Sequence, residues 1–185
     1  MLELGKVSLK NNKYLIEKRN KLFDLAMDLG FGEVEVTRLT TAASEVIRSI
    51  AGADKRNGLA FFLEEKQSRL GLLLHFISAN NLKKSFNVLE NIFDETDYSL
   101  SEDGLNVLSA FKYIPDYSFK PTEDFLNTER EKIRRLTRDE LFSELKNSYS
   151  KLKEEVEAHN RTERMLKIAN VQAEAANKAK SEFLA

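Results

Sequence analysis

The stretch "LAFFLEEKQSRLGLLLHFIS", residues 59–78, decides the fold class of this chain. Two apolar, strand-forming runs, residues 59–65 and 70–78, are joined by the polar segment KQSR. This pattern predicts a β-hairpin. We therefore expect a sheet built around this hairpin, with helices packed on one of its faces.

The segments on either side of the hairpin alternate between strand and helix patterns. Residues 6–9 and the two halves of 96–115, which are separated by a turn at Glu102–Gly104, are typical of strands. Residues 11–31, 33–52 and 82–93 carry apolar side chains at helical spacing, and Gly30 and Gly52 end the first two. The order β-α-α-β-β-α-β-β predicts an α+β, two-layer α/β sandwich with a mixed or antiparallel sheet. The expected buried face of the second helix consists of Val36, Leu39, Ala43, Val46, Ile47 and Ile50.

Composition excludes several classes of function. The 185 residues include no cysteine, which excludes disulfides, Cys-ligated zinc and thiol catalysis. Lys and Arg number 29 against 30 Asp and Glu, and this balance argues against a nucleic-acid partner. The N-terminus lacks the apolar region of a signal peptide, and no run approaches the roughly 18 apolar residues of a membrane helix. We expect a cytoplasmic chain with no membrane partner.

The C-terminal third is expected to be helical throughout. All seven glycines lie at or before Gly104, and the only prolines are Pro115 and Pro121. We therefore predict a globular domain over residues 1–116, a connector over 117–137 and a long helix over 138–185. Two matches to the T-x-x-E capping box, Thr128–Glu131 and Thr137–Glu140, predict that the helix pauses and restarts near residue 137.

The long helix carries a 4,3 spacing that is typical of a coiled coil. The predicted dimer interface is Leu145, Tyr149, Leu152, Val156, His159, Leu166 and Ala173. The first half of this seam is apolar and the second half is polar and alanine-rich. Such a helix would be about 70 Å long and cannot bury its apolar face alone. We predict a parallel homodimer, with a folded-back helical hairpin as the alternative.

Residues 7–52 resemble the opening of the RsbT-type branch of the GHKL ATPases, the anti-sigma-factor serine kinases. The segment "LTTAASEVIRSIAG", residues 39–52, follows the family's second helix closely, and residues 91–115 are similar to the end of the same domain. The resemblance covers about residues 4–116. It implies a GHKL, or Bergerat-like, ATP-binding fold.

The chain departs from this family where the nucleotide would bind. The degenerate nucleotide-site positions are Glu45, Arg48, Ser49, Ser78, Asn80 and Asn81. Glu45 and Arg48 match the family, but Ser49 stands where the family has a magnesium-binding Asn. In the D-x-G-x-G motif, Ser78 replaces the Asp that binds adenine, and Asn80 replaces the first Gly. The phosphate-covering lid is missing. Because catalysis by this fold depends on a positioned metal–triphosphate, we expect no ATP, no cofactor and no catalytic residue.

Residues 161–185 resemble the signalling helix that leads into the phosphoacceptor domain of sensor histidine kinases. The matching residues are Ala176, Asn177, Ala179, Lys180, Ser181, Phe183, Leu184 and Ala185. The match stops before the phosphoacceptor histidine, so we expect that the chain is truncated ahead of that domain. The two resemblances together imply the input region of a cytosolic, hybrid-type histidine kinase. By analogy with RsbT-like proteins, a STAS-like regulatory protein is the expected partner.

Two other functions remain open at this point. The first is an active RsbT-like ATPase or protein serine kinase with an atypical nucleotide loop. The second is a plain dimerisation scaffold without an input role. The two histidines, His75 in a strand run and His159 on the seam, fit structural positions better than metal ligands, so no metal site is predicted.

Overall fold

The computed structural model describes residues 1–9, 15–52, 54–135 and 138–184, and the chain divides into two compact units after Arg135. The first unit contains β1 (Leu2–Ser8), α1 (Leu15–Asp28), α2 (Glu33–Ile50), β2 (Gly58–Lys66), β3 (Arg69–Ser78), α3 (Lys83–Glu90), β4 (Glu95–Leu100), β5 (Asn106–Tyr113) and α4 (Glu123–Arg134). The second contains α5 (Arg138–Leu184). The predicted β-α-α-β-β-α-β-β order is therefore confirmed.

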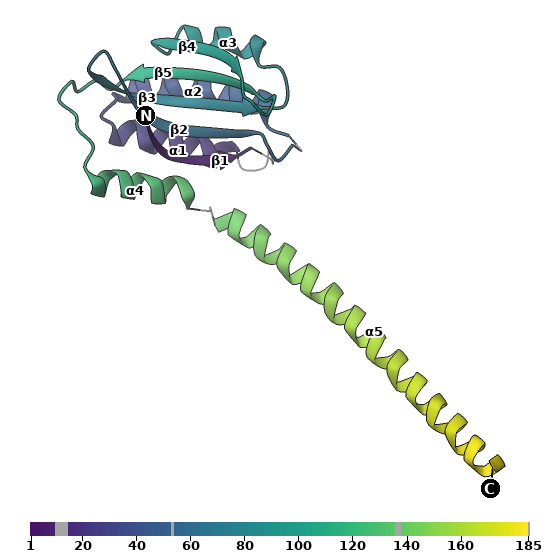
Figure 1. The fold of residues 1–185 in the computed structure, drawn as a ribbon. Helices are drawn as coiled ribbons and strands as arrows, with labels where there is room; N and C mark the ends of the chain where they lie inside the picture. Colours follow the sequence, from purple (N-terminus) through teal and green to yellow (C-terminus); the bar gives the residue numbers. More distant parts are fainter. Residues whose placement is uncertain (10–14, 53, 136–137, 185) are drawn as a thin grey trace. The chain divides into compact units, whose positions relative to one another are not determined.

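The sheet has the strand order β1-β2-β3-β5-β4, and each neighbouring pair is antiparallel (Figure 1). The predicted hairpin is confirmed as β2–β3, with Lys66 paired to Arg69 at its closed end. Gln67 and Ser68 form the two-residue turn with φ values of 50° and 60°. Two successive positive φ angles are the geometry of a type I′ turn, whose twist matches that of the flanking strands.

Helices α1 and α2 cover one face of the sheet (Figure 1). Their apolar stripes pack on alternate side chains of the strands, such as Leu72, Leu74 and Phe76 of β3, which are all at most 1% exposed. The six side chains predicted for the buried face of α2 are likewise at most 1% exposed. The two-layer α+β arrangement follows from this burial of one sheet face by amphipathic helices.

Helix α4 belongs to the first unit, so the expected boundary at residue 116 and the connector over 117–137 need correction. The helix contacts β1 and α1, and Ile133 is buried there at 2% exposure. The approach is close at Gly5, where a Cβ would lie 2.8 Å from Cγ2 of Ile133. Lys21 of α1 donates hydrogen bonds to the carbonyl oxygens of Ile133 and Arg135 at 2.7 and 2.8 Å. The last turn of α4 is therefore tied to α1.

The predicted caps of the C-terminal helices also need correction. Helix α4 begins after Thr122, whose hydroxyl oxygen accepts a hydrogen bond from the backbone N–H of Phe125. Thr128 lies inside the helix, and its hydroxyl donates to the carbonyl oxygen of Asp124 at 2.8 Å. The T-x-x-E pattern therefore did not identify the cap, because the T-E-D-F segment before it has the required geometry. The predicted cap at Thr137 lies outside the described residues.

Candidate functional site

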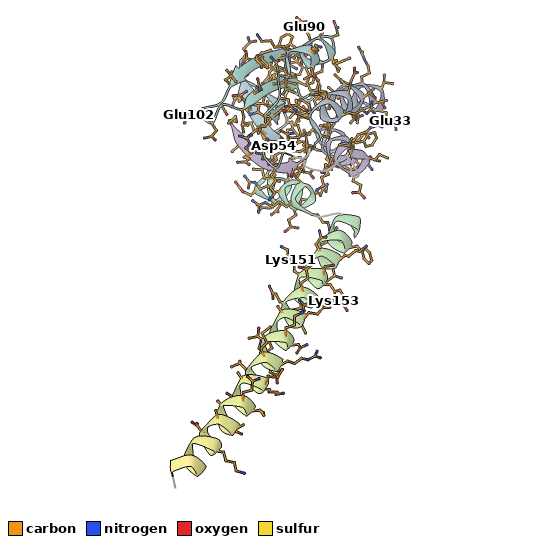
Figure 2. The ribbon with its side chains drawn as sticks, turned by 90° about the vertical axis from the view of Figure 1, so that its right-hand side faces the viewer. Glu33, Asp54, Glu90, Glu102, Lys151 and Lys153 are labelled. Carbon is orange, nitrogen blue, oxygen red and sulfur yellow. The ribbon has the colours of Figure 1, made fainter. Side chains whose placement is uncertain are left out.

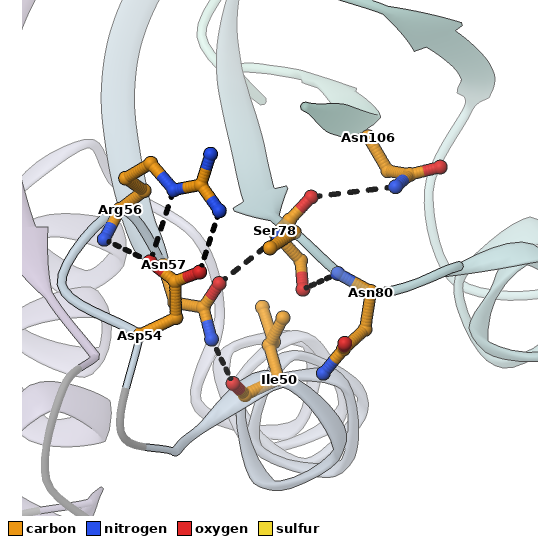
Figure 3. Close-up of polar contacts among 8 residues, drawn as sticks. Ile50, Asp54, Arg56, Asn57, Ser78, Asn80 and Asn106 are labelled. Carbon is orange, nitrogen blue, oxygen red and sulfur yellow. Dashed lines mark hydrogen bonds and ion pairs between the residues drawn. The ribbon is translucent and has the colours of Figure 1, made fainter. Parts of the chain in front are cut away.

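The first candidate site lies where the C-terminal end of α2 meets the start of β2 and the end of β3 (Figure 3). Its central side chain is Asn57, which is 2% exposed. The Asn57 Nδ2 donates to the carbonyl oxygen of Ile50 at 2.7 Å, and its Oδ1 accepts from the N–H of Ala79 at 3.1 Å. One carboxamide therefore joins the last turn of α2 to the loop after β3.

Ser78 and the loop that follows it make local hydrogen bonds around this carboxamide (Figure 3). Ser78 is fully buried, and its Oγ accepts from the N–H of Asn80 at 3.0 Å. Asn106 Nδ2 donates to the Ser78 carbonyl oxygen at 3.4 Å. Asn81 Oδ1 accepts from the N–H of Lys83 at 2.8 Å, at the start of α3. These residues form a strand-to-helix loop whose hydrogen bonds go to the protein itself.

The other degenerate positions lie on α2. The Ser49 hydroxyl donates to the carbonyl oxygen of Val46 at 2.7 Å and lies 3.1 Å from the hydroxyl of Ser85 on α3. Helix α3 therefore packs directly against Ser49 of α2. Glu45 and Arg48 are exposed. Within the described part of the chain, neither side chain forms an ion pair.

The turn that precedes Asn57 is held by an ion pair. Arg56 Nη2 lies 2.8 Å from Asp54 Oδ2, and the backbone N–H of Arg56 donates to Asp54 Oδ1 at 2.9 Å. The hydrogen bonds from the Arg56 side chain and backbone lower the pKa of Asp54 to about 2. The Asn57 N–H then donates to the carbonyl oxygen of Asp54 at 3.3 Å, which closes the turn. This turn places Asn57 immediately before the start of β2.

Sequence reasoning missed Asn57, Ser85 and Asn106. The dipeptide Asn57–Gly58 is a turn signal, and that was the available clue. The clue predicts a turn but does not indicate that the carboxamide faces inward. The same limitation applies to Asn106, whose Oδ1 accepts a hydrogen bond from the Tyr98 hydroxyl across the β4–β5 pair.

The chemistry of this region is that of a satisfied structural network. Its buried polar side chains, Asn57, Ser78 and Ser85, are all hydrogen-bonded. Among the described residues, no three His, Cys, Asp or Glu side chains are grouped so that they could hold a metal ion. His75 lies on the face of the sheet that α1 and α2 do not cover, with its ring centroid 4.8 Å from that of Phe62. Burial lowers the pKa of His75, and the nearby Glu64 carboxylate opposes that shift.

The second candidate site is the predicted seam along α5, which is 47 residues long (Figure 2). The seam side chains are exposed in the single chain: Leu145 by 67%, Tyr149 by 69%, Leu152 by 58%, Val156 by 50% and Leu166 by 58%. His159 and Ala173 are also exposed. Lys151 and Lys153, which flank Leu152, are charged positions outside the seam (Figure 2).

Comparison with known proteins adds no assignment. No protein-family model matches the chain, and no curated protein is similar to it at a significant level. Over the residues that the structure describes, no helix is both long enough and apolar enough to cross a membrane.

Proposed function

We propose that the chain is a non-catalytic sensory, regulatory and dimerisation module of a cytoplasmic two-component histidine kinase. In this proposal the first unit is a degenerate GHKL-like domain that binds a STAS-like or other regulatory protein. The second unit relays that binding event through a parallel coiled coil to a kinase core. The observation that carries the proposal is the exposed apolar seam of α5, which runs into the segment that resembles the lead-in to a phosphoacceptor domain.

The seam supports dimerisation on energetic grounds. Full burial of one large aliphatic side chain stabilises by about 1.5–3 kcal/mol. Leu145, Leu152, Val156 and Leu166 are each at least half exposed in the single chain, so a partner helix has several such side chains to cover. A second copy of the same helix presents the same spacing, which makes it the simplest partner.

The network around Asn57 supports the non-catalytic part. The loop after β3 bonds to Asn57 and Ser78, and α3 packs against Ser49 of α2. A nucleotide bound as in the GHKL family needs a carboxylate for its adenine and glycines that allow the backbone to approach its phosphates. In this chain, the Asn57 carboxamide and the Ser78 hydroxyl already accept hydrogen bonds from the N–H groups of the loop after β3. Nucleotide binding would therefore require breaking buried hydrogen bonds.

Signal relay follows from two-state helix packing. A regulatory partner that prefers one arrangement of the paired input domains shifts the population of the helix pair between two rotations. The rotation then changes how the downstream histidine meets its ATP-binding domain.

Deletions that change the rotation of α5 about its axis test the relay. The chain is joined after Ala185 to a histidine kinase core, and autophosphorylation is measured for two internal deletions. Deleting residues 151–157 removes one heptad and nearly preserves the alignment of the seam. Deleting residues 151–154 instead rotates the part of the seam after the deletion by about 40° relative to the part before it. We expect the heptad deletion to retain the parent rate and the four-residue deletion to change it several-fold. Equal rates for all three proteins would refute the relay.

A calorimetric titration with Mg-ATP tests the non-catalytic part separately. We expect no saturable heat. Micromolar binding would support the active RsbT-like ATPase or serine kinase instead, and the relay experiment would still report on the helix.

A further inference from the structure

On the face of the sheet opposite α1 and α2, two cations and three aromatic rings contact one another in a row at the closed end of the β2–β3 hairpin. This cation–aromatic ladder consists of Lys66, Phe111, Tyr113, Arg69 and Tyr117. Lys66 Nζ lies 4.6 Å from the Phe111 ring centroid, and the Phe111 and Tyr113 rings meet edge to face at 4.9 Å. The guanidinium carbon of Arg69 lies 4.5 Å from the Tyr113 centroid and 3.8 Å from the Tyr117 centroid.

The strand register builds this ladder. Lys66 pairs with Arg69 across β2–β3, and Gly71 pairs with Tyr113 across β3–β5, so the side chains project from one face. Gly71 leaves room for the neighbouring ring, because a Cβ there would lie 2.2 Å from Cζ of Phe111. The ladder is therefore a packed feature of the fold.

The two cations of the ladder differ in their partners. Lys66 forms ion pairs with Glu95 at 2.6 Å and with Glu64 at 3.8 Å. For Arg69, the described residues supply no acidic partner, and its Nε is buried without a hydrogen-bond acceptor. Buried donors without a partner are rare in folded proteins and call for an explanation. A ligand that supplies the acceptor provides one.

We propose that Arg69 binds a carboxylate side chain of an acidic peptide segment carried by a protein partner. A guanidinium presents parallel N–H donors that match a carboxylate, and it can keep a stacking contact with an aromatic ring while it makes that contact. The ligand is a carboxylate and not a phosphate dianion because Arg69 is the one cation of the ladder that lacks an acidic partner among the described residues, whereas Lys66 pairs with Glu95 and Glu64. Tyr117 covers Arg69 but is itself 74% exposed, so a peptide can displace its ring and reach Nε. This proposal does not depend on the kinase assignment.

Nuclear magnetic resonance of the arginine Nε–Hε groups in the full chain tests the site. The probe is the capped peptide acetyl-GSEESG-amide, with acetyl-GSQQSG-amide as its uncharged match. We expect the Arg69 signal to shift saturably with the acidic peptide alone. The affinity of the Arg69→Lys protein, which has no Arg69 signal, is measured from its backbone amide signals. Lysine keeps the charge but lacks the parallel N–H donors of the guanidinium, so this substitution is expected to weaken binding by about tenfold or more. Arg56→Lys is the matched control and leaves the affinity unchanged, because Arg56 already pairs with Asp54.

Three outcomes would overturn the proposal. The first is equal affinity in the Arg69→Lys protein, and the second is an equal response to the uncharged peptide. The third is a shift of the Arg69 signal by inorganic phosphate with none by the acidic peptide. If Arg69→Lys does not fold, Tyr117→Ala serves in its place, because Tyr117 lies in an exposed loop and leaves Arg69 intact. Because the peptide displaces that ring to reach Nε, its removal is expected to raise the peptide affinity several-fold, and an unchanged affinity counts against the site.

Discussion

Replacing Asn57 with Ala removes the carboxamide that joins α2 to the loop after β3. Its two hydrogen bonds, of 2.7 and 3.1 Å, are lost, and the carbonyl of Ile50 and the N–H of Ala79 are left without their partner. An unsatisfied buried group costs about 1–3 kcal/mol. The Ile50 bond is fully buried and the Ala79 bond partly buried, so we expect the free energy of unfolding to fall by about 3 kcal/mol in total. For a domain of this size the same change lowers Tm by roughly 10 °C.

Urea denaturation followed by near-ultraviolet circular dichroism measures this change, because the signal reports aromatic packing in the first unit. The matched control is Asn80→Ala in the same loop. The Asn80 side chain is exposed, so its removal is expected to change stability by about 0.5 kcal/mol or less. A stability of Asn57→Ala equal to that of the control would refute the view that this carboxamide holds the two elements together.

Three further predictions concern other parts of the chain. Gly71→Ala is expected to lower stability by about 1–3 kcal/mol, because the new Cβ would lie 2.2 Å from a ring carbon of Phe111; thermal unfolding measures the loss. Burial raises the pKa of Glu129 above 4.5, so the folded state holds the proton more tightly than the unfolded state, and the contribution of Glu129 to stability falls as the pH rises above that value. In urea titrations at pH values from below 4.5 upward, Glu129→Gln is expected to lack this fall in stability. Leu152→Asp combined with Leu166→Asp places two charges on the seam and is expected to reduce the mass seen by light scattering to that of the monomer.

Each of these predictions has a matched control. Gly32→Ala should be nearly neutral, because its added Cβ would have no atom within 4 Å apart from those of its chain neighbours. Glu131→Gln, at an exposed position of α4, should leave the pH dependence as in the parent protein. Lys151→Asp combined with Lys178→Asp changes two exposed positions outside the seam and should leave the dimer intact. A dimer that survives both seam substitutions would mean that the globular units hold the pair together.

Periodicity in the sequence was sufficient to predict the main elements of the first unit. The β2–β3 hairpin follows from two apolar runs and a polar turn, and the buried face of α2 follows from helical spacing. Both depend on residues a few positions apart, whose relative directions the local backbone geometry sets. The exposed positions of the α5 seam follow from the same rule, whereas the pairing of two such helices remains a prediction.

Other features needed the tertiary structure because they join residues that are distant in sequence. Lys21 meets the carbonyl of Ile133 across 112 positions, and this contact makes α4 part of the first unit. Asn57 meets Ala79 across 22 positions, and no local pattern indicates that its carboxamide faces inward. The contacts of Arg69 with two tyrosines depend in the same way on the register of β3 and β5 and on the loop after β5. The sequence by itself determined the elements and their apolar faces, because these are local properties. Only the folded chain decided which polar side chains are buried together, because that depends on how the elements pack.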